Sequence, residues 1–338
     1  MCPDTTLRLA EESGKVIGEI PVKDSNSLSG GWKMRTSHSL VLGLLALLAV
    51  NHWATQPVFA GYIYVTDNGD NKIYRANADG SNLIELLSVG DFPYGLAVDQ
   101  ANEKVYWADM ATGQIHRADL DGSNMADVIP VKDPSHLALN TSEGKIYWTR
   151  NPSGDADDAV ERADLDGSNR QVLVTGISFP RGIAIAEGLG KVYWADSNGI
   201  NRANLDGSGI EGILTGSGVF SDIELDEKRS KIYYGQSGEI RRANFDGTDV
   251  EVVAVGGGRG IALDLTHDKI YWLDKENAPY GAWRWLIQRS NLDGSGQELL
   301  FEMASNSYLI DIDYVVPEPT TLSILAFGIL ALLRRRRS

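Results

Sequence analysis

A tyrosine-led motif recurs six times along this chain, at intervals of 42, 41, 46, 40 and 38 residues. Every copy is followed by an arginine and then by an Asp-Gly pair, as in Arg117, Asp121 and Gly122. Self-similarity with a period near 40 residues is typical of a repeat protein, in which each unit buries its faces against its neighbours. The repeats fill residues 61–316 of the 338, so we expect one ring there and not the two domains that the length alone suggests.

Each repeat is expected to form four short strands. The run from Gly95 to Asp99 is typical of a first strand, the tyrosine-led motif of a second, and residues 114–120 of a third. The Asp-Gly pair marks a tight hairpin because both residues tolerate positive φ. An apolar run such as residues 171–174 supplies the fourth strand. The sequence therefore predicts an all-β fold, a six-bladed β-propeller with four-stranded blades.

The two ends of the repeat region predict how the ring closes. The chain enters the region at a second strand, residues 62–67, and leaves it through residues 309–313, which match the first-strand pattern. We expect this C-terminal strand to complete the N-terminal blade. Closure of this kind removes the open sheet edges that promote aggregation.

The tetrads that begin at the six tyrosines resemble the YWTD repeat, the class B repeat of the low-density lipoprotein receptor. They are Tyr64-Val65-Thr66-Asp67, Tyr106-Trp107-Ala108-Asp109, Tyr147-Trp148-Thr149-Arg150, Tyr193-Trp194-Ala195-Asp196, Tyr233-Tyr234-Gly235-Gln236 and Tyr271-Trp272-Leu273-Asp274. The resemblance covers nearly all of residues 61–316 and implies a six-bladed propeller. The third and fifth copies lack the terminal Asp, so the resemblance implies no shared role for that residue in them.

Residues 34–60 are predicted to form a secretory signal peptide. Arg35 gives a positive n-region, and residues 40–50 form an apolar segment of eleven residues. Residues 57–60 form an exit with a β-branched residue, Val58, and a small residue, Ala60, at the −3 and −1 positions before Gly61. Eleven residues are too few for a membrane span; the alternative is a buried core helix. Residues 1–33 are polar and form a doubtful extension, because we interpret Met34 as the start of translation. They hold the single cysteine, Cys2, which excludes a disulfide framework.

The last 22 residues have three parts: Pro317-Glu318-Pro319, an apolar run to Leu333, and four arginines before the final serine. This order resembles the PEP-CTERM sorting signal of Gram-negative bacteria. The resemblance implies export, recognition by an exosortase near the tripeptide, a membrane segment before processing, and release or attachment at the cell surface. We expect no nucleic-acid partner, because the arginines match a positive-inside stop and the formal net charge is −15.

Sequence motifs of catalysis and metal binding give little support for an enzyme. No Gly-x-Ser-x-Gly elbow or Walker loop occurs, and His116, His136 and His267 lack the i, i+4 spacing of a helical zinc site. The Asp-Gly turns do not match an EF-hand, so turn chemistry explains them better than Ca²⁺ does. The acidic run 154–158 is expected to be a solvated loop, with weak cation binding as the alternative. We expect no cofactor, and Ca²⁺ stays open.

Binding residues are expected on one face of the ring, where the loops from second to third strands and from fourth to first strands lie. The fourth-to-first loops carry Phe92 and Phe179, and the long loop at 274–285 breaks the repeat. Aromatic residues and arginine are the types enriched at binding hot spots. The candidate binding residues are Tyr94, Arg181, Arg259, Tyr280, Trp283, Arg284, Trp285 and Tyr308. For Trp283 and Trp285 the alternative is a local core on the blade.

These observations indicate an exported, non-catalytic binding or scaffold propeller. It would present the loop-built face to a protein or polysaccharide at the cell surface or in the matrix of a Gram-negative bacterium. The alternative is a calcium-assisted hydrolase or lactonase with its site in the central channel, which rests on fold-level analogy.

Overall fold

The computed structural model describes residues 6–8, 19–21, 61–90, 92–151, 157–216, 218–277, 283–303 and 309–315. The chain divides into two units, Met1–Gln56 and Pro57–Ser338. In the first unit, β1 (Thr6–Arg8) pairs antiparallel with β2 (Glu19–Pro21). The expected signal peptide and the segment 317–338 lie outside the described residues. Within the part of the chain that is described, no helix has the length and apolar character needed to cross a membrane.

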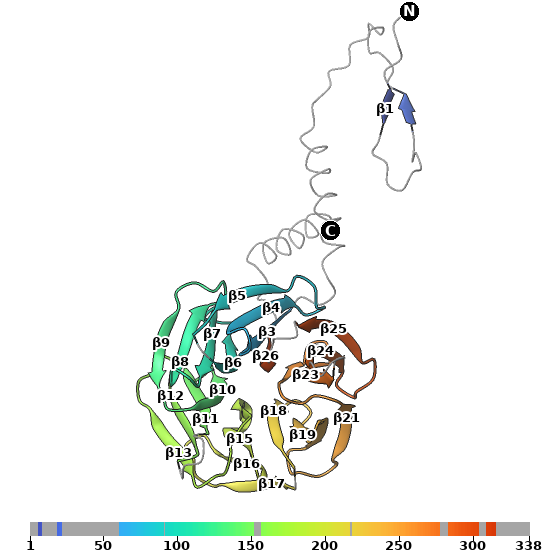
Figure 1. Cartoon of the computed structure of the whole chain (residues 1–338). Helices are drawn as coiled ribbons and strands as arrows, with labels where there is room; N and C mark the ends of the chain where they lie inside the picture. Colours follow the sequence, from blue (N-terminus) through green and yellow to red (C-terminus); the bar gives the residue numbers. More distant parts are fainter. Residues whose placement is uncertain are drawn as a thin grey trace, which may run out of the picture. The chain divides into compact units, whose positions relative to one another are not determined.

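The second unit is a ring of six four-stranded antiparallel sheets (Figure 1). The first blade combines the two ends of the ring: β26 (Leu309–Val315), β3 (Tyr62–Asp67), β4 (Lys72–Asn77) and β5 (Ile84–Ser88). The second blade is β6 (Pro93–Asp99), β7 (Lys104–Asp109), β8 (Gln114–Asp119) and β9 (Ala126–Pro130). The third blade is β10 (Pro134–Asn140), β11 (Lys145–Arg150), β12 (Ala159–Asp164) and β13 (Gln171–Thr175).

The remaining three blades repeat this order from the ring centre outward. The fourth is β14 (Ile183–Ala186), β15 (Lys191–Asp196), β16 (Gly199–Asn204) and β17 (Glu211–Thr215), with the 3₁₀ helix η1 (Glu187–Leu189) after β14. The fifth is β18 (Phe220–Asp226), β19 (Lys231–Gln236), β20 (Glu239–Asn244) and β21 (Glu251–Val255). The sixth is β22 (Ile261–Asp264), β23 (Lys269–Asn277), β24 (Trp283–Asn291) and β25 (Glu298–Met303). The predicted six-bladed propeller is confirmed.

The core lies between the blades. Trp107 of the second blade is 1% exposed and packs with Tyr64 and Ile73 of the first blade. Trp148, Trp194 and Trp272 repeat this position and are fully buried. Each large aromatic side chain buries on the order of 150–250 Å², so the tryptophans of the repeat fill the wedges between neighbouring sheets.

Ring closure follows the predicted route. β26 pairs with β3, with Val315 opposite Tyr62 and Asp313 opposite Tyr64. A side-chain hydrogen bond also joins the sixth blade to the first: Arg289 Nη1 donates to the carbonyl of Ala78 at 2.7 Å. Arginines at the same repeat position bridge other junctions: Arg75 to Leu120, Arg162 to Leu205, Arg202 to Phe245 and Arg242 to Leu292.

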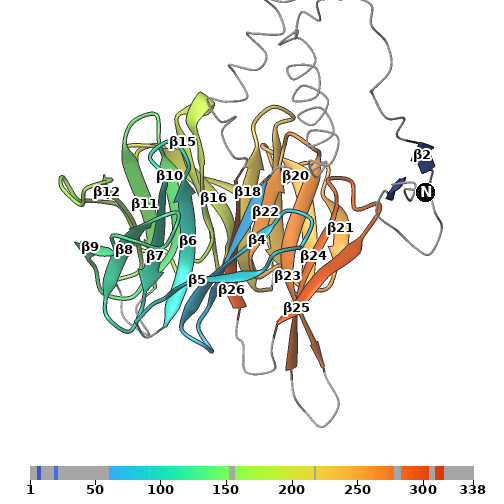
Figure 2. The same ribbon diagram turned by 90° about the horizontal axis from the view of Figure 1, so that it is seen from above.

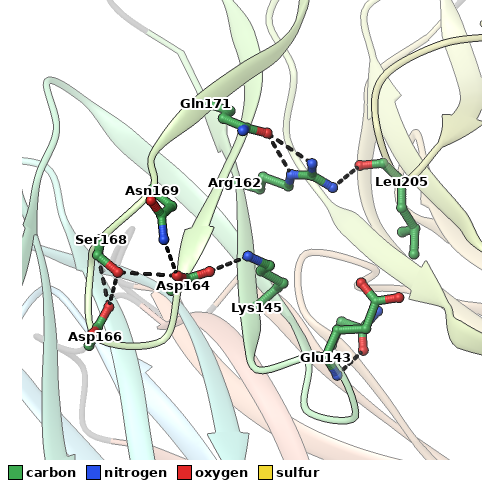
Figure 3. A network of polar contacts seen from close by, with 10 residues as sticks. Glu143, Lys145, Arg162, Asp164, Asp166, Ser168, Asn169, Gln171 and Leu205 are labelled. Atoms are coloured by element: carbon green, nitrogen blue, oxygen red, sulfur yellow. Dashed lines mark hydrogen bonds and ion pairs between the residues drawn. The ribbon is translucent and has the colours of Figure 1, made fainter.

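The Asp-Gly turns lie against the preceding blade. Gly122 has φ 84°, and a Cβ there would lie 2.4 Å from the carbonyl oxygen of Leu86, so both the turn and the packing require glycine. In the third blade (Figure 3), Asp164 accepts hydrogen bonds from Lys145, from Ser168 and from Asn169. The Lys145 ammonium is the main reason that the pKa of Asp164 falls to about 2. These turns connect third to fourth strands and lie on one face of the ring, which we call the face of fixed turns.

Candidate functional site

The opposite side of the ring carries the irregular connections, which we call the loop face. It consists of the described residues in the loops from second to third strands and from fourth to first strands. In Figure 2 it is the lower side of the ring, where the β23–β24 hairpin projects. β23 and β24 have nine residues each, whereas β7 and β8 have six. The sixth blade thus extends the loop face, as the break in the repeat predicts.

A cavity of about 260 Å³ opens on the loop face between the fifth and sixth blades; we call it the cationic cavity. The charged groups that line it are Arg181, Arg259, Lys275 and Asp274. Its other lining residues are Val219, Ser221, Ser237, Gly238, Gly257, Leu273 and Trp285. Three cations and one carboxylate therefore face the same space.

Trp285 forms the wall of this cavity that continues into the core. Its side chain is 1% exposed and packs with Leu273 and Ile287. The guanidinium carbon of Arg259 and the ammonium of Lys275 each lie 5.6 Å from the centre of the indole ring. Cation–π contacts of this kind hold long side chains in place. The buried indole thus positions two of the three cations.

Asp274 is the acceptor in the cavity. One carboxylate oxygen accepts from the Lys275 amide at 2.7 Å, and the other accepts from Gln288 Nε2 at 2.7 Å. Burial raises the pKa of the Asp274 carboxyl, and the bond from the Lys275 amide opposes that rise. The neighbouring carboxylate of Glu276 pairs with Arg284 at 2.8 Å.

The structure brings together three of the candidate binding residues, Arg181, Arg259 and Trp285. Trp285 has the buried position of the local-core alternative, so its contact with a ligand stays a prediction. Arg284 lies on the projecting hairpin, between Glu276 and Glu302. Tyr94 lies away from the cavity, where its ring packs edge-on against His136 at 5.3 Å.

For the other candidates the structure says less. The backbone of Trp283 pairs with Asn277, and Tyr280 and Tyr308 lie outside the described residues. Sequence reasoning missed Ser237 and Gly238 as cavity residues. They occupy the short turn after the fifth tetrad, and the available signal was that this turn shares a face with the neighbouring fourth-to-first loops.

Two exposed phenylalanines on the loop face have strained backbones. Phe92 has φ 72° and Phe179 has φ 50°, and their side chains are 46% and 53% exposed. The left-handed region is unfavourable for bulky residues. Hydrogen bonds hold both, since the Phe92 amide donates to Asn71 Oδ1 and the Phe179 amide to Asp158 Oδ2. Strain of this type concentrates at functional sites.

The central channel holds a second cavity, of about 310 Å³, lined by first strands. Asp222 is buried there, and its oxygens accept from the amides of Ile223 and Ile261 at 2.9 and 2.7 Å. Burial raises the Asp222 pKa, and the nearby Glu224 carboxylate raises it further. Asp313 accepts from the Val98 amide at 2.8 Å. Among the described residues, no group of three or more His, Cys, Asp or Glu side chains is arranged to hold a metal ion.

Comparison with known proteins gives two findings on the sequence. A family model for the PEP-CTERM protein-sorting motif matches residues 315–337. The vitellogenin receptor Yl of Drosophila melanogaster is 35% identical over 142 residues, which is 40% of this chain and 7% of the receptor. Low-density lipoprotein receptor-related protein 5 of Mus musculus is 35% identical over 146 residues, 40% of this chain and 9% of that protein. The matches thus span less than a tenth of each relative.

Solved structures share the fold. A chain of the nidogen/laminin complex superposes with a TM-score of 0.65 and 20% identity, over 77% of this chain and all of that one. TolB from Acinetobacter baumannii superposes with a TM-score of 0.61 and 15% identity, over 81% of this chain and 72% of TolB. Identities this low show a common fold and nothing more.

Fold, repeats and sorting motif define a class, that of six-bladed propellers with an export signal. The relatives of this chain are low-density lipoprotein receptor YWTD-repeat proteins, as its tetrads indicate. Its PEP-CTERM motif points to export to the cell envelope of a bacterium and implies processing by an exosortase.

Proposed function

We propose that this protein is a non-catalytic binding propeller whose loop face holds a protein or a polysaccharide at the bacterial cell surface or in the extracellular matrix. The observation that carries the proposal is the cationic cavity. Its three cations gather in a molecule whose formal net charge is −15. A local excess of one charge focuses ligands of the opposite charge, and arginine and tryptophan are enriched where binding energy concentrates.

The direction in which the chain leaves the ring supports the proposal. First strands begin on the loop face and end on the face of fixed turns. β26 is the first strand of its blade and ends at Val315, where the sorting motif begins. A tether attached through this motif therefore leaves the loop face directed away from the point of attachment, where a partner has access to it.

Two matched charge reversals in the full-length chain test the proposal, Arg259→Glu and Lys228→Glu. Arg259 is exposed on the loop face, and Lys228 is exposed in the turn between β18 and β19 on the opposite face. Both variants change the net charge equally, so they differ in position alone. We expect Arg259→Glu to reduce retention on envelope and matrix fractions of the source bacterium about tenfold or more, and Lys228→Glu to leave it unchanged.

The control is thermal melting of both variants. Each should keep one cooperative transition, because both side chains are exposed, and Arg259→Glu should melt at a slightly lower temperature because it loses the contact with the Trp285 ring. Equal retention of the two folded variants would contradict a binding role for the loop face.

A further inference from the structure

The charge and size of the cationic cavity limit what it can hold. Arg181, Arg259 and Lys275 outnumber the single lining carboxylate, so the cavity favours a ligand with at least one negative charge. Its volume of about 260 Å³ lies just below the range of roughly 300–1,000 Å³ that is usual for ligand pockets. The cavity thus fits one small residue of a longer ligand.

The cavity is arranged before any ligand arrives. Arg259 and Lys275 both lie against the buried indole of Trp285, which restricts their side-chain motion. Arg181 comes from the start of the fourth blade, where its backbone is fixed: its amide donates to the Ala195 carbonyl at 2.8 Å, and its carbonyl accepts from the Thr149 hydroxyl at 2.6 Å. Restriction of this kind lowers the entropy cost of binding.

The polar groups of the cavity distinguish among anions. Ser221 and Ser237 bring hydroxyl groups, and the Asp274 carboxylate brings acceptor oxygens, to the same space as the cations. The Asp274 carboxylate accepts hydrogen bonds from hydroxyl groups. The ionised carboxylate of an acidic side chain supplies no such donor. The lining therefore suits a ligand that carries a carboxylate and several hydroxyls on one small ring.

We infer that the cationic cavity binds a uronic acid residue of an anionic polysaccharide. Arg181 and Arg259 take the sugar carboxylate, and Asp274 with the two serines takes the ring hydroxyls. This inference rests on the proposed function of the loop face and names the ligand class of that face. Both Asp274 oxygens already accept one hydrogen bond each, and the Ser221 hydroxyl donates to the Gly258 carbonyl. An acidic polysaccharide is favoured over an acidic peptide because sugar hydroxyls can donate to the remaining lone pairs of these oxygens, whereas a peptide carboxylate cannot.

Calorimetric titration of the full-length chain tests the inference with three probes. They are trigalacturonate, its methyl ester, and triglutamate. The ester keeps every hydroxyl and removes the charge, and triglutamate keeps the charge and removes the hydroxyls. We expect trigalacturonate to bind at least about tenfold more tightly than either of the others, since each lost charged contact costs about a factor of ten.

Variants locate the binding. The double variant Arg181→Gln/Arg259→Gln should bind trigalacturonate at least about tenfold more weakly than the unmodified chain. The variant Lys228→Gln, on the opposite face, should bind it with an affinity within about twofold of the unmodified chain. Ser237→Ala is a second, milder variant that keeps every charge, and it should weaken trigalacturonate but not triglutamate. Thermal melting confirms that each variant is folded.

Four results overturn the inference. If triglutamate binds as tightly as trigalacturonate, the ligand is an acidic peptide. If the methyl ester binds as tightly, the cations have no role in binding. If folded Arg181→Gln/Arg259→Gln binds trigalacturonate as tightly as the unmodified chain does, the site lies elsewhere. Absence of trigalacturonate binding, together with retention that still depends on Arg259, overturns the uronate assignment and leaves the proposed function standing. If retention on envelope fractions does not depend on Arg259 either, both the uronate assignment and the proposed function are overturned.

Discussion

At the residue scale, His136 shows how the innermost strands fit together. It occupies the repeat position where the second, fourth and sixth blades have Gly95, Gly182 and Gly260. A Cβ at Gly95 would lie 2.5 Å from His136 Cα, and one at Gly182 would lie 2.6 Å from Asp222 Cα. A small residue in one blade therefore makes room for a large residue in the next, and the marker glycine appears in alternate blades for that reason.

Burial of His136 makes stability depend on pH. Burial, aided by the Arg181 charge, lowers the His136 pKa from 6.5 to about 3. Between these two values the unfolded chain binds a proton that the folded chain does not, so stability falls as the pH falls, by about 1.4 kcal/mol per unit. Urea unfolding should show that lowering the pH from 7 to about 4.5 costs His136→Gln about 3 kcal/mol less than the unmodified chain.

The comparison between the two proteins isolates His136 because the other acidic groups are present in both. Asp222 acts in the opposite sense, since its raised pKa adds stability as the pH falls. Identical pH slopes for the two proteins would show that His136 is protonated in the fold.

Phe179 offers a test that separates strain from binding. Its φ of 50° is costly for phenylalanine and easy for glycine, while its side chain is 53% exposed. We expect Phe179→Gly to raise stability by about 1 kcal/mol or leave it unchanged, and to reduce retention on envelope fractions. Lower stability with full retention would mean that the phenyl ring of Phe179 supports the fold and does not contact a ligand.

At the element scale, the terminal aspartate of the tetrad caps the turn after the second strand in the first, second and fourth blades. Asp109 accepts from the Thr112 amide at 2.9 Å, and Asp196 accepts from the Asn198 amide at 2.7 Å. In the third blade Arg150 replaces this aspartate, and its guanidinium reaches Glu161 on β12 at 3.1 Å. An ion pair between β11 and β12 thus takes the place of the turn cap in a blade where the connection is longer.

Closure by β26 is the element on which the ring depends. Deletion of residues 308–314 removes nearly all the β26 partners of β3 and leaves β3, which stays paired with β4, as an open edge of the sheet. We expect the truncated chain to lose its cooperative thermal transition, because the first blade is left with three strands and no innermost strand to face the neighbouring blades. Circular dichroism measures this, and a truncated protein that melts like the full chain would refute closure by β26.

At the scale of the whole molecule, the repeated features of the sequence predicted the blades, whereas the sequence could not predict which residues the loops bring together. Tyrosine spacing, Asp-Gly turns and the split first blade were enough for the propeller and its closure. The sequence could not predict that Arg181 and Arg259 line the same cavity, because they come from loops before different blades. Burial of Trp285 likewise depends on how the β23–β24 hairpin returns to the sheet.

The strand that closes the ring also has a mechanical role. β26 ends at Val315, the first residue of the matched sorting motif, and it is an edge strand whose partner in the sheet is β3. When the loop face is held by a partner and the C-terminal end by the envelope, any pull between the two enters the propeller through β26. The hydrogen bonds to β3 then resist that pull, so we expect the first blade to set the force at which an attached propeller opens.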